Sequence, residues 1–294
     1  MKKNKKRNFI VLGIVIVLVA CITIMLFQVK GEKKEVVETD QNSYRYIKVD
    51  GKDYRYRTNL KTILFLGIDT TDETKNQGQS DAIDLAIFDR DQQKIKIISL
   101  SRDTMCKIRL FDSEGNDLGW DKQHLGLAYS YGKNRKHGGI LAKDAVSKLL
   151  SDVPLVNYTA FDLNSLQELQ DIIGDMPMVL DDDYIDINPL WKKGKKIVIN
   201  RDNVEEFVRS RNTSKDYSNK TRMQRQKLYI QTYINQLKTQ LTNDYSTTLQ
   251  KMYNFYSKLT TNITLKEIDS YAEMILNYSI DNNEYYTLPG EDQK

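Results

Sequence analysis

The sequence is poor in the residues that build disulfide frameworks and zinc sites. It contains two Cys and two His in 294 residues. Cys21 lies in an apolar run, so it cannot pair with Cys106 if that run is in lipid. Zinc sites need three or four His or Cys ligands, and small secreted domains usually need several disulfides. Both classes are therefore excluded, and a divalent metal here is expected to be Mg²⁺ held by carboxylates.

A strong net charge is also lacking outside the N-terminus. The formal net charge is +4, but six of the 44 basic residues lie in the first thirty residues, where no acid occurs. This leaves 38 basic against 40 acidic residues. A nearly neutral chain gives no argument for nucleic acid as a partner, so a DNA-binding regulator is disfavoured. Any anion site must come from local clustering of charges.

Charged residues are absent between Phe9 and Phe27. As a helix this run spans roughly 28 Å, enough to cross a hydrocarbon core. The preceding Lys/Arg cluster predicts a cytoplasmic N-terminus, and no small-residue cleavage site follows the run, which disfavours a cleaved signal peptide. We expect a cytoplasmic tail (1–8), a single-pass anchor in the cell membrane (9–28), a linker or peripheral hairpin (29–58) and an extracytoplasmic domain (59–294). An exported domain without disulfides fits a bacterial surface.

From residue 59 onward, short apolar runs alternate with helical patterns. Buried strands are predicted at 62–67, 82–88, 95–100, 178–180 and 197–199, and helices at 140–150, 163–173, 204–208, 223–241, 245–258 and 264–277. In the long helix, the apolar residues recur at spacings of three, four and seven, which is one amphipathic face. Mixed strands and helices predict an α/β or α+β sandwich. The same apolar residues would line a lipid tunnel or fill a core, and core is the default.

The sequence also lacks a phosphate-cradling glycine loop, a G-x-S-x-G elbow and an H-E-x-x-H motif. It has instead two carboxylates at the ends of predicted strands. Asp69 lies at the end of the first strand, and Asp81 lies just before the second, after a polar loop. Converging carboxylates of this kind predict a magnesium site. For either residue alone, ordinary loop polarity is the simpler interpretation.

Arginines form the second group of candidates. Arg102 and Asp103 come just after the predicted strand 95–100. Arg209 and Arg211 are two positions apart, so in an extended segment they would lie on the same side. Arg222 and Gln226 lie one turn apart at the start of the long helix, with Arg225 nearby. Arginine suits phosphate because its planar fork stays charged and donates paired hydrogen bonds. A structural ion pair or a solvated basic stretch would explain each alone; together with the carboxylates they predict a magnesium–pyrophosphate clamp.

The order of these motifs resembles the LytR–CpsA–Psr family over roughly residues 60–240. The matching segments are Ile63–Asp69, Gly78–Asp81, Ser101–Thr104, Ala128–Gly132, Phe207–Arg211 and Arg222–Gln226. Members of this family transfer glycopolymers such as wall teichoic acid or capsule from a polyprenyl pyrophosphate to peptidoglycan. The resemblance implies an α–β–α sandwich with a central mixed sheet, after one transmembrane helix, and a hydrophobic tunnel for the polyprenyl chain.

The resemblance also implies roles for residues. Asp69 and Asp81 would bind Mg²⁺, and the pyrophosphate would be held by Arg102, Arg209, Arg211, Arg222 and Gln226. Asp103 would orient Arg102, and Asp81 and Asp103 are the candidates for a base. The implied reaction is attack by a peptidoglycan hydroxyl, that of C6 of N-acetylmuramic acid, on the phosphorus next to the glycopolymer, with undecaprenyl phosphate leaving. The expected setting is the membrane of a Gram-positive bacterium.

Some positions depart from the family pattern. Gln79 stands where the family usually has Arg, Ser101 where it has Pro, and Asp84 where an apolar residue is expected; residues 123–127 lack the usual Lys and Asn. Loss of the Arg removes one phosphate contact, worth about 1.5–3 kcal/mol if charge-assisted. Two other functions therefore stay open: a polyprenyl-pyrophosphate hydrolase, and a non-catalytic lipid-glycan binding or regulatory protein.

Overall fold

The computed structural model describes residues 46–49, 51–70, 78–214 and 219–291, and divides into two units at Tyr56/Arg57. The predicted tail and anchor (1–28) lie outside the described residues. Among the described residues, no helix is long and apolar enough to cross a bilayer. In the first unit, strands β1 (Tyr46–Val49) and β2 (Lys52–Arg55) form an antiparallel hairpin.

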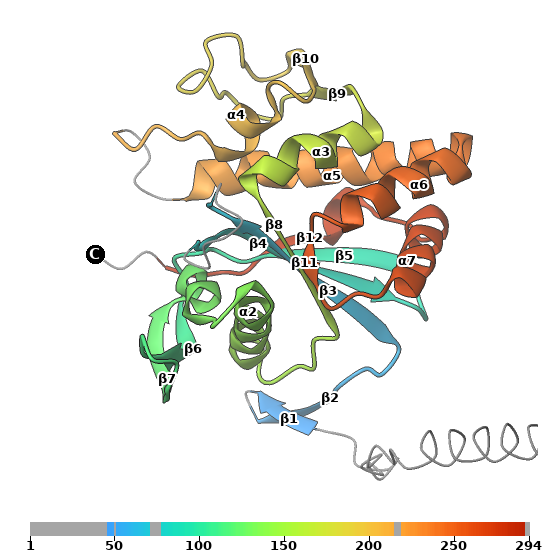
Figure 1. Ribbon diagram of the computed structural model, residues 1–294. Helices are drawn as coiled ribbons and strands as arrows, with labels where there is room; N and C mark the ends of the chain where they lie inside the picture. The colour runs from blue at the N-terminus through green and yellow to red at the C-terminus, as the bar shows by residue number, and fades with distance from the viewer. Residues whose placement is uncertain (1–45, 50, 71–77, 215–218, 292–294) are drawn as a thin grey trace, which may run out of the picture. The chain divides into compact units, whose positions relative to one another are not determined.

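The second unit is built on a mixed sheet of six strands (Figure 1). Its order is β11 (Thr260–Thr261), β8 (Asn157–Asp162), β3 (Leu60–Ile68), β4 (Ser80–Asp89), β5 (Lys94–Ser99) and β12 (Tyr285–Thr287). The pairs β3–β8 and β5–β12 are parallel, and the other pairs are antiparallel. Two smaller antiparallel pairs accompany it: β6 (Met105–Phe111) with β7 (Asp117–His124), and β9 (Met176–Val179) with β10 (Lys196–Ile199).

Helices cover both faces of this sheet (Figure 1). The first face carries α2 (Arg135–Leu149) and the 3₁₀ segment η1 (Leu125–Tyr131); the second carries α3 (Leu163–Ile173), α5 (Lys220–Asn243), α6 (Tyr245–Tyr256) and α7 (Leu265–Asn277). A short helix, α4 (Val204–Arg209), precedes α5, and η2 (Asn282–Glu284) precedes β12. The unit is therefore the α–β–α sandwich with a mixed sheet that the sequence predicted.

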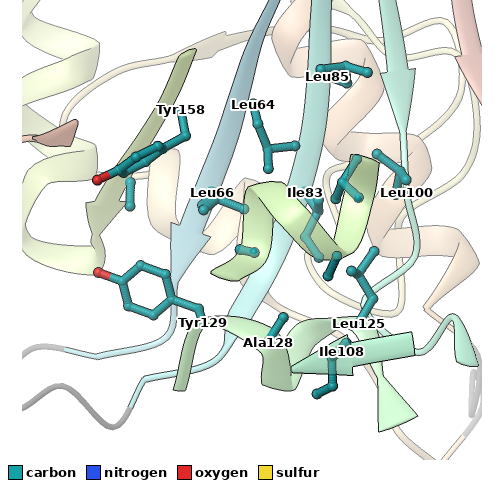
Figure 2. Packing of buried hydrophobic residues seen from close by; sticks show 14 of the residues in the cluster. Leu64, Leu66, Ile83, Leu85, Leu100, Ile108, Leu125, Ala128, Tyr129 and Tyr158 are labelled. Atoms are coloured by element: carbon teal, nitrogen blue, oxygen red, sulfur yellow. The ribbon is translucent and has the colours of Figure 1, made fainter. Parts of the chain in front are cut away.

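The strict alternation of the strands decides which residues face which layer. Leu64, Leu66 and Ile83 point to the α2 face, where they pack with Ala128, Tyr129 and Tyr158 (Figure 2). Their neighbours Ile63 and Ala86 point to the other face, toward α5 and α7. Because both faces are covered, these strands are apolar on both sides.

Most predicted elements are present with shifted ends. The chain also contains strands that the patterns did not predict, namely β6, β7, β8, β11 and β12. Strand β7 is largely exposed, so it has no apolar run, while β11 and β12 are two or three residues long. The predicted strands near 178 and 197 pair with each other outside the main sheet.

Candidate active site

The two predicted metal ligands meet where β3 ends and β4 begins. The Asp69 carboxylate accepts a hydrogen bond from the Gln79 N–H at 2.6 Å, and the Asp69 N–H donates to the Gln79 carbonyl at 3.0 Å. A register shift follows, in which Gly67 pairs with Ala82 but Ile68 pairs with Ser80. Asp81 is thus the extra residue of a β-bulge, and both Asp81 and Ala82 line the same cavity. Bulges commonly redirect a side chain in this way beside functional sites.

Asp81 is shared by two arginines from distant parts of the chain. Its Oδ1 is ion-paired with Arg102, and its Oδ2 accepts from Arg222 Nη1 at 2.9 Å. Arg102 follows β5 and Arg222 lies in the first turn of α5. Asp81 therefore joins the sheet to the long helix and holds both guanidinium groups at one place.

Arg102 is positioned by three further contacts. Its Nη2 donates to Gln79 Oε1 at 2.7 Å, and its Nε lies 3.5 Å from Asp103 Oδ1. Its backbone carbonyl accepts from the Gly126 N–H in η1 at 2.9 Å. Gln79, which replaces an expected phosphate-binding Arg, thus orients Arg102 instead.

Arg222 is the buried member of the cluster, with 3% of its surface exposed. Its Nε donates to the Asn219 side chain at 2.7 Å. Burial, and after it the positive charges of Arg211 and Arg102, lower the pKa of Arg222 to about 10. The guanidinium stays charged at neutral pH, but it lies among like charges. Asp81, which accepts from Arg222 Nη1, supplies the nearby negative charge.

The segment between α4 and α5 carries the remaining candidates. Arg209 is the last residue of α4, not part of an extended segment, and donates to Glu205 at 2.9 Å. Gln226 donates to the Val208 carbonyl at 3.0 Å. Arg211 is exposed and lines a separate, shallow polar pocket with Asn212 and Ser214. Arg209, Arg222 and Gln226 line the cavity that Asp69 and Asp81 also line; Arg102, Asp103 and Arg211 do not.

This cavity has a volume of about 330 Å³ and runs between the sheet and helices α3, α5, α6 and α7. Charged side chains stand at the end formed by the β3–β4 turn. Farther along, the walls are apolar, with Phe65, Ala86, Ile230, Ile234 and Tyr271 among them. The size falls within the range of ligand sites. The apolar face of α5 is therefore in part a cavity wall, where core was the default prediction.

The two carboxylates suit a hard cation whose remaining ligands come from phosphate. Asp69 and Asp81 line one cavity mouth, and Mg²⁺ is commonly held by one or two carboxylates together with substrate phosphates. In the described part of the chain, no group of three or more His, Cys, Asp or Glu is arranged to hold a metal by itself. The donor set thus fits Mg²⁺ bound jointly with phosphate.

Sequence patterns missed two residues of this region. Asp162 lines the cavity, is ion-paired with Arg135 at 3.0 Å and caps α3 through the Ser165 N–H. Although burial opposes it, the contacts with Arg135 and Ser165 keep the pKa of Asp162 below its usual value. Asn219 orients Arg222. The signal for Asp162 was its place before a helical pattern, which is typical of an N-cap.

Fold and site together define a class: an α/β sandwich in which an arginine–carboxylate cluster stands at the mouth of an apolar cavity. A family model places the chain within this class. The model of the LytR_cpsA_psr family matches residues 22–294, and the chain belongs to that family.

Individual relatives are distant. An uncharacterized protein of Staphylococcus aureus is 27% identical over 201 residues, which cover 63% of this chain and 45% of that protein. The crystal structure of Bacillus subtilis TagV is 19% identical, with a TM-score of 0.60 over 81% of this chain and 87% of that chain. The structure of TagT bound to LI-WTA is 20% identical, with a TM-score of 0.56 over 79% and 78%. These structures share the fold.

Proposed function

We propose that this chain is a magnesium-dependent phosphotransferase that moves an anionic glycopolymer from undecaprenyl pyrophosphate to peptidoglycan. The observation that carries the proposal is the union of two features in one cavity: apolar walls suited to an isoprenoid, and a mouth of Arg209, Arg222, Asp69 and Asp81 suited to a metal pyrophosphate. Family membership supports it, as does the relative TagT, which was solved bound to LI-WTA.

In this proposal the pyrophosphate lies at the mouth, among Arg102, Arg222 and Arg209, with Arg211 and Gln226 at the border. Asp69 and Asp81 would hold Mg²⁺, whose chemistry there would be neutralisation of phosphate charge. Since Asp81 now bridges two arginines, phosphate binding would draw these guanidinium groups partly away from it. Phosphoryl transfer needs mainly such positioning and charge neutralisation.

The reaction joins a peptidoglycan hydroxyl, that of C6 of N-acetylmuramic acid, to the phosphorus next to the glycopolymer. The bond from that phosphorus to the bridging oxygen breaks, and undecaprenyl phosphate leaves with the electron pair. The hydroxyl proton passes to Asp103, which is half-exposed beside Arg102, or to Asp81, or to solvent. We place the domain outside the membrane, anchored through residues 9–28.

The test is acceptor-dependent coupling. Purified protein is incubated with a polyprenyl-pyrophosphate glycan, peptidoglycan oligomers and Mg²⁺, with or without chelator, and linked glycan is followed by mass spectrometry. Arg102→Ala is expected to slow coupling by about 10²–10³-fold, as loss of one charge-stabilising donor does. Arg201→Ala, which removes an exposed ion pair with Asp171, is the matched control and should leave the rate unchanged.

Other outcomes would replace the proposal. Release of lipid phosphate without coupled product identifies a hydrolase with the same clamp. Tight lipid binding with neither product, across several glycan donors, identifies a binding or regulatory protein.

A further inference from the structure

A carboxylate lies inside the apolar part of the cavity. Asp84 is in the middle of β4, on the face that its neighbours Ala82 and Ala86 also turn to the cavity. Only 9% of its surface is exposed. Asp84 is three positions after Asp81, which is about 10 Å along an extended strand. Asp84 is therefore below the charged mouth, where an isoprenoid attached to phosphate there would pass.

The partners of Asp84 are few and neutral. The Ser99 hydroxyl, opposite it on β5, donates to Asp84 Oδ1 at 2.5 Å, and Phe65 is opposite it on β3. An ionised carboxylate can accept about four hydrogen bonds, and buried charge without a cationic partner is costly. Burial accordingly raises the pKa of Asp84 to about 6, and the Ser99 bond opposes part of that rise.

Among the described residues that line the apolar part of the cavity, the titratable groups other than Asp84 are tyrosines. From β12, Tyr285 is close, and its pKa is raised by burial and then by Asp84. From the helices, burial raises the pKa values of Tyr229, Tyr233 and Tyr271, so they remain neutral. The charged groups that line the same cavity are Asp69, Asp81, Asp162, Arg209 and Arg222.

Lipid changes the surroundings of this carboxyl. An open cavity lets water reach Asp84, whereas a hydrocarbon chain displaces that water and offers no hydrogen bond. The ionised form then loses hydration that nothing replaces, and the neutral form loses little. Binding of the hydrocarbon chain is therefore favoured when Asp84 is protonated.

We propose that Asp84 is a specificity-determining residue of the cavity, which admits an isoprenoid chain only with its carboxyl protonated, so that lipid binding takes up one proton. The inference rests on the proposed function, because it takes the cavity as the lipid site. It deepens that function: lipid affinity at this chain's site falls as pH rises, in a way that an apolar residue at 84 would not produce.

The experiment compares wild type with Asp84→Asn, which keeps the size of the side chain and an oxygen to accept from Ser99. The probe is geranylgeranyl phosphate, and its dissociation constant is measured by titration calorimetry at pH 5.5 and 7.5. With a free-protein pKa of about 6, the variant should bind about 30-fold more tightly than wild type at pH 7.5, and within about twofold at pH 5.5.

Inorganic pyrophosphate is the internal control, because it occupies the mouth alone and reports the pH dependence of the phosphate and the arginines. Its affinity should be the same in both proteins at each pH. Asp84→Met serves if the Asn variant does not fold, and should tighten lipid binding at pH 7.5 at least as much.

If the ratio of the lipid dissociation constants of variant and wild type is the same at the two pH values, the proposed role of Asp84 is wrong. Absence of lipid binding in every protein at both pH values, with pyrophosphate still bound, overturns the lipid site and hence the proposed function as well.

Discussion

At the scale of single residues, the site is organised by charges that are shared. Asp81 serves two arginines, Arg102 is held by Gln79 as well as by Asp81, and Arg222 is held by Asn219. This arrangement keeps several guanidinium groups together despite their repulsion. Gln79 is the clearest example of a changed role. The family pattern has an Arg at this position, whereas Gln79 accepts a hydrogen bond from Arg102 and orients it.

Asp84 also has a consequence for stability. Its folded-state pKa of about 6 lies above the ordinary 3.8, so the folded protein binds this proton more tightly than the unfolded chain. The resulting stabilisation is complete below about pH 3.8 and is lost as pH rises through about 6. We expect Asp84→Asn to raise the free energy of unfolding at pH 7.5 by about 2–3 kcal/mol relative to wild type. At pH 4 the difference should be small.

Urea titrations at the two pH values measure this difference. The effect of solvent conditions on all other groups cancels between variant and wild type. If the free energies of unfolding of variant and wild type differ equally at pH 4 and pH 7.5, ionisation of Asp84 does not destabilise the folded protein.

At the scale of elements, α5 is tied to α4 by a buried arginine. Arg225 is completely buried, donates through Nε to the Phe207 carbonyl at 2.8 Å and through Nη2 to the Ser210 carbonyl. Its guanidinium also lies over the Tyr184 ring, 5.6 Å from the centroid. It therefore holds the chain that carries Arg209 and Arg211, and its role is to position that segment.

Replacing this side chain tests that role. Arg225→Met leaves two backbone carbonyls without these donors, which should lower the free energy of unfolding by about 2–4 kcal/mol. Lys227→Met, at a partly exposed position of the same helix, should change it by less than about 0.5 kcal/mol. Chemical denaturation of both variants provides the comparison, and similar losses in the two would contradict a bridging role for Arg225.

At the scale of the whole molecule, the cavity exists because the helix layer does not close fully on the sheet. On the α2 face, the corresponding space is filled by side chains such as Leu64, Leu66 and Tyr158 (Figure 2). On the other face, residues from strands and from α5, α6 and α7 leave about 330 Å³ open. One sheet thus supports a packed core on one side and an open cavity on the other.

Filling the apolar part of the cavity should weaken lipid binding and leave pyrophosphate binding at the charged mouth unchanged. Ala86→Phe puts a ring into the apolar part, and we expect geranylgeranyl phosphate to bind at least about tenfold more weakly, a loss of 1.4 kcal/mol or more. Inorganic pyrophosphate should bind as before. Ile140→Phe, at an exposed position of α2, is the control for the added ring. Equal loss of both ligands would mean that the variant disturbs the fold and not the cavity alone.

By itself, the sequence determined the sandwich class, most helix positions, half of the strands in the second unit, and the candidates Asp69, Asp81, Arg209, Arg222 and Gln226, which line one cavity. These follow from periodicity and from strand ends, which are local properties of the chain. The order of the short motifs along the chain also indicated the family, which the family model confirms.

Only the tertiary structure decided the rest. The bulge that turns Asp81 to the cavity depends on pairing between strands, and the division between Arg222 at the site and Arg225 beneath α4 depends on how α5 is rotated. The place of Asp84 inside the cavity belongs here too. A cavity wall and a packed core need the same apolar periodicity, because each helix or strand presents one apolar face in both cases. Whether the opposing faces meet is a property of several distant segments together, and no local pattern contains it.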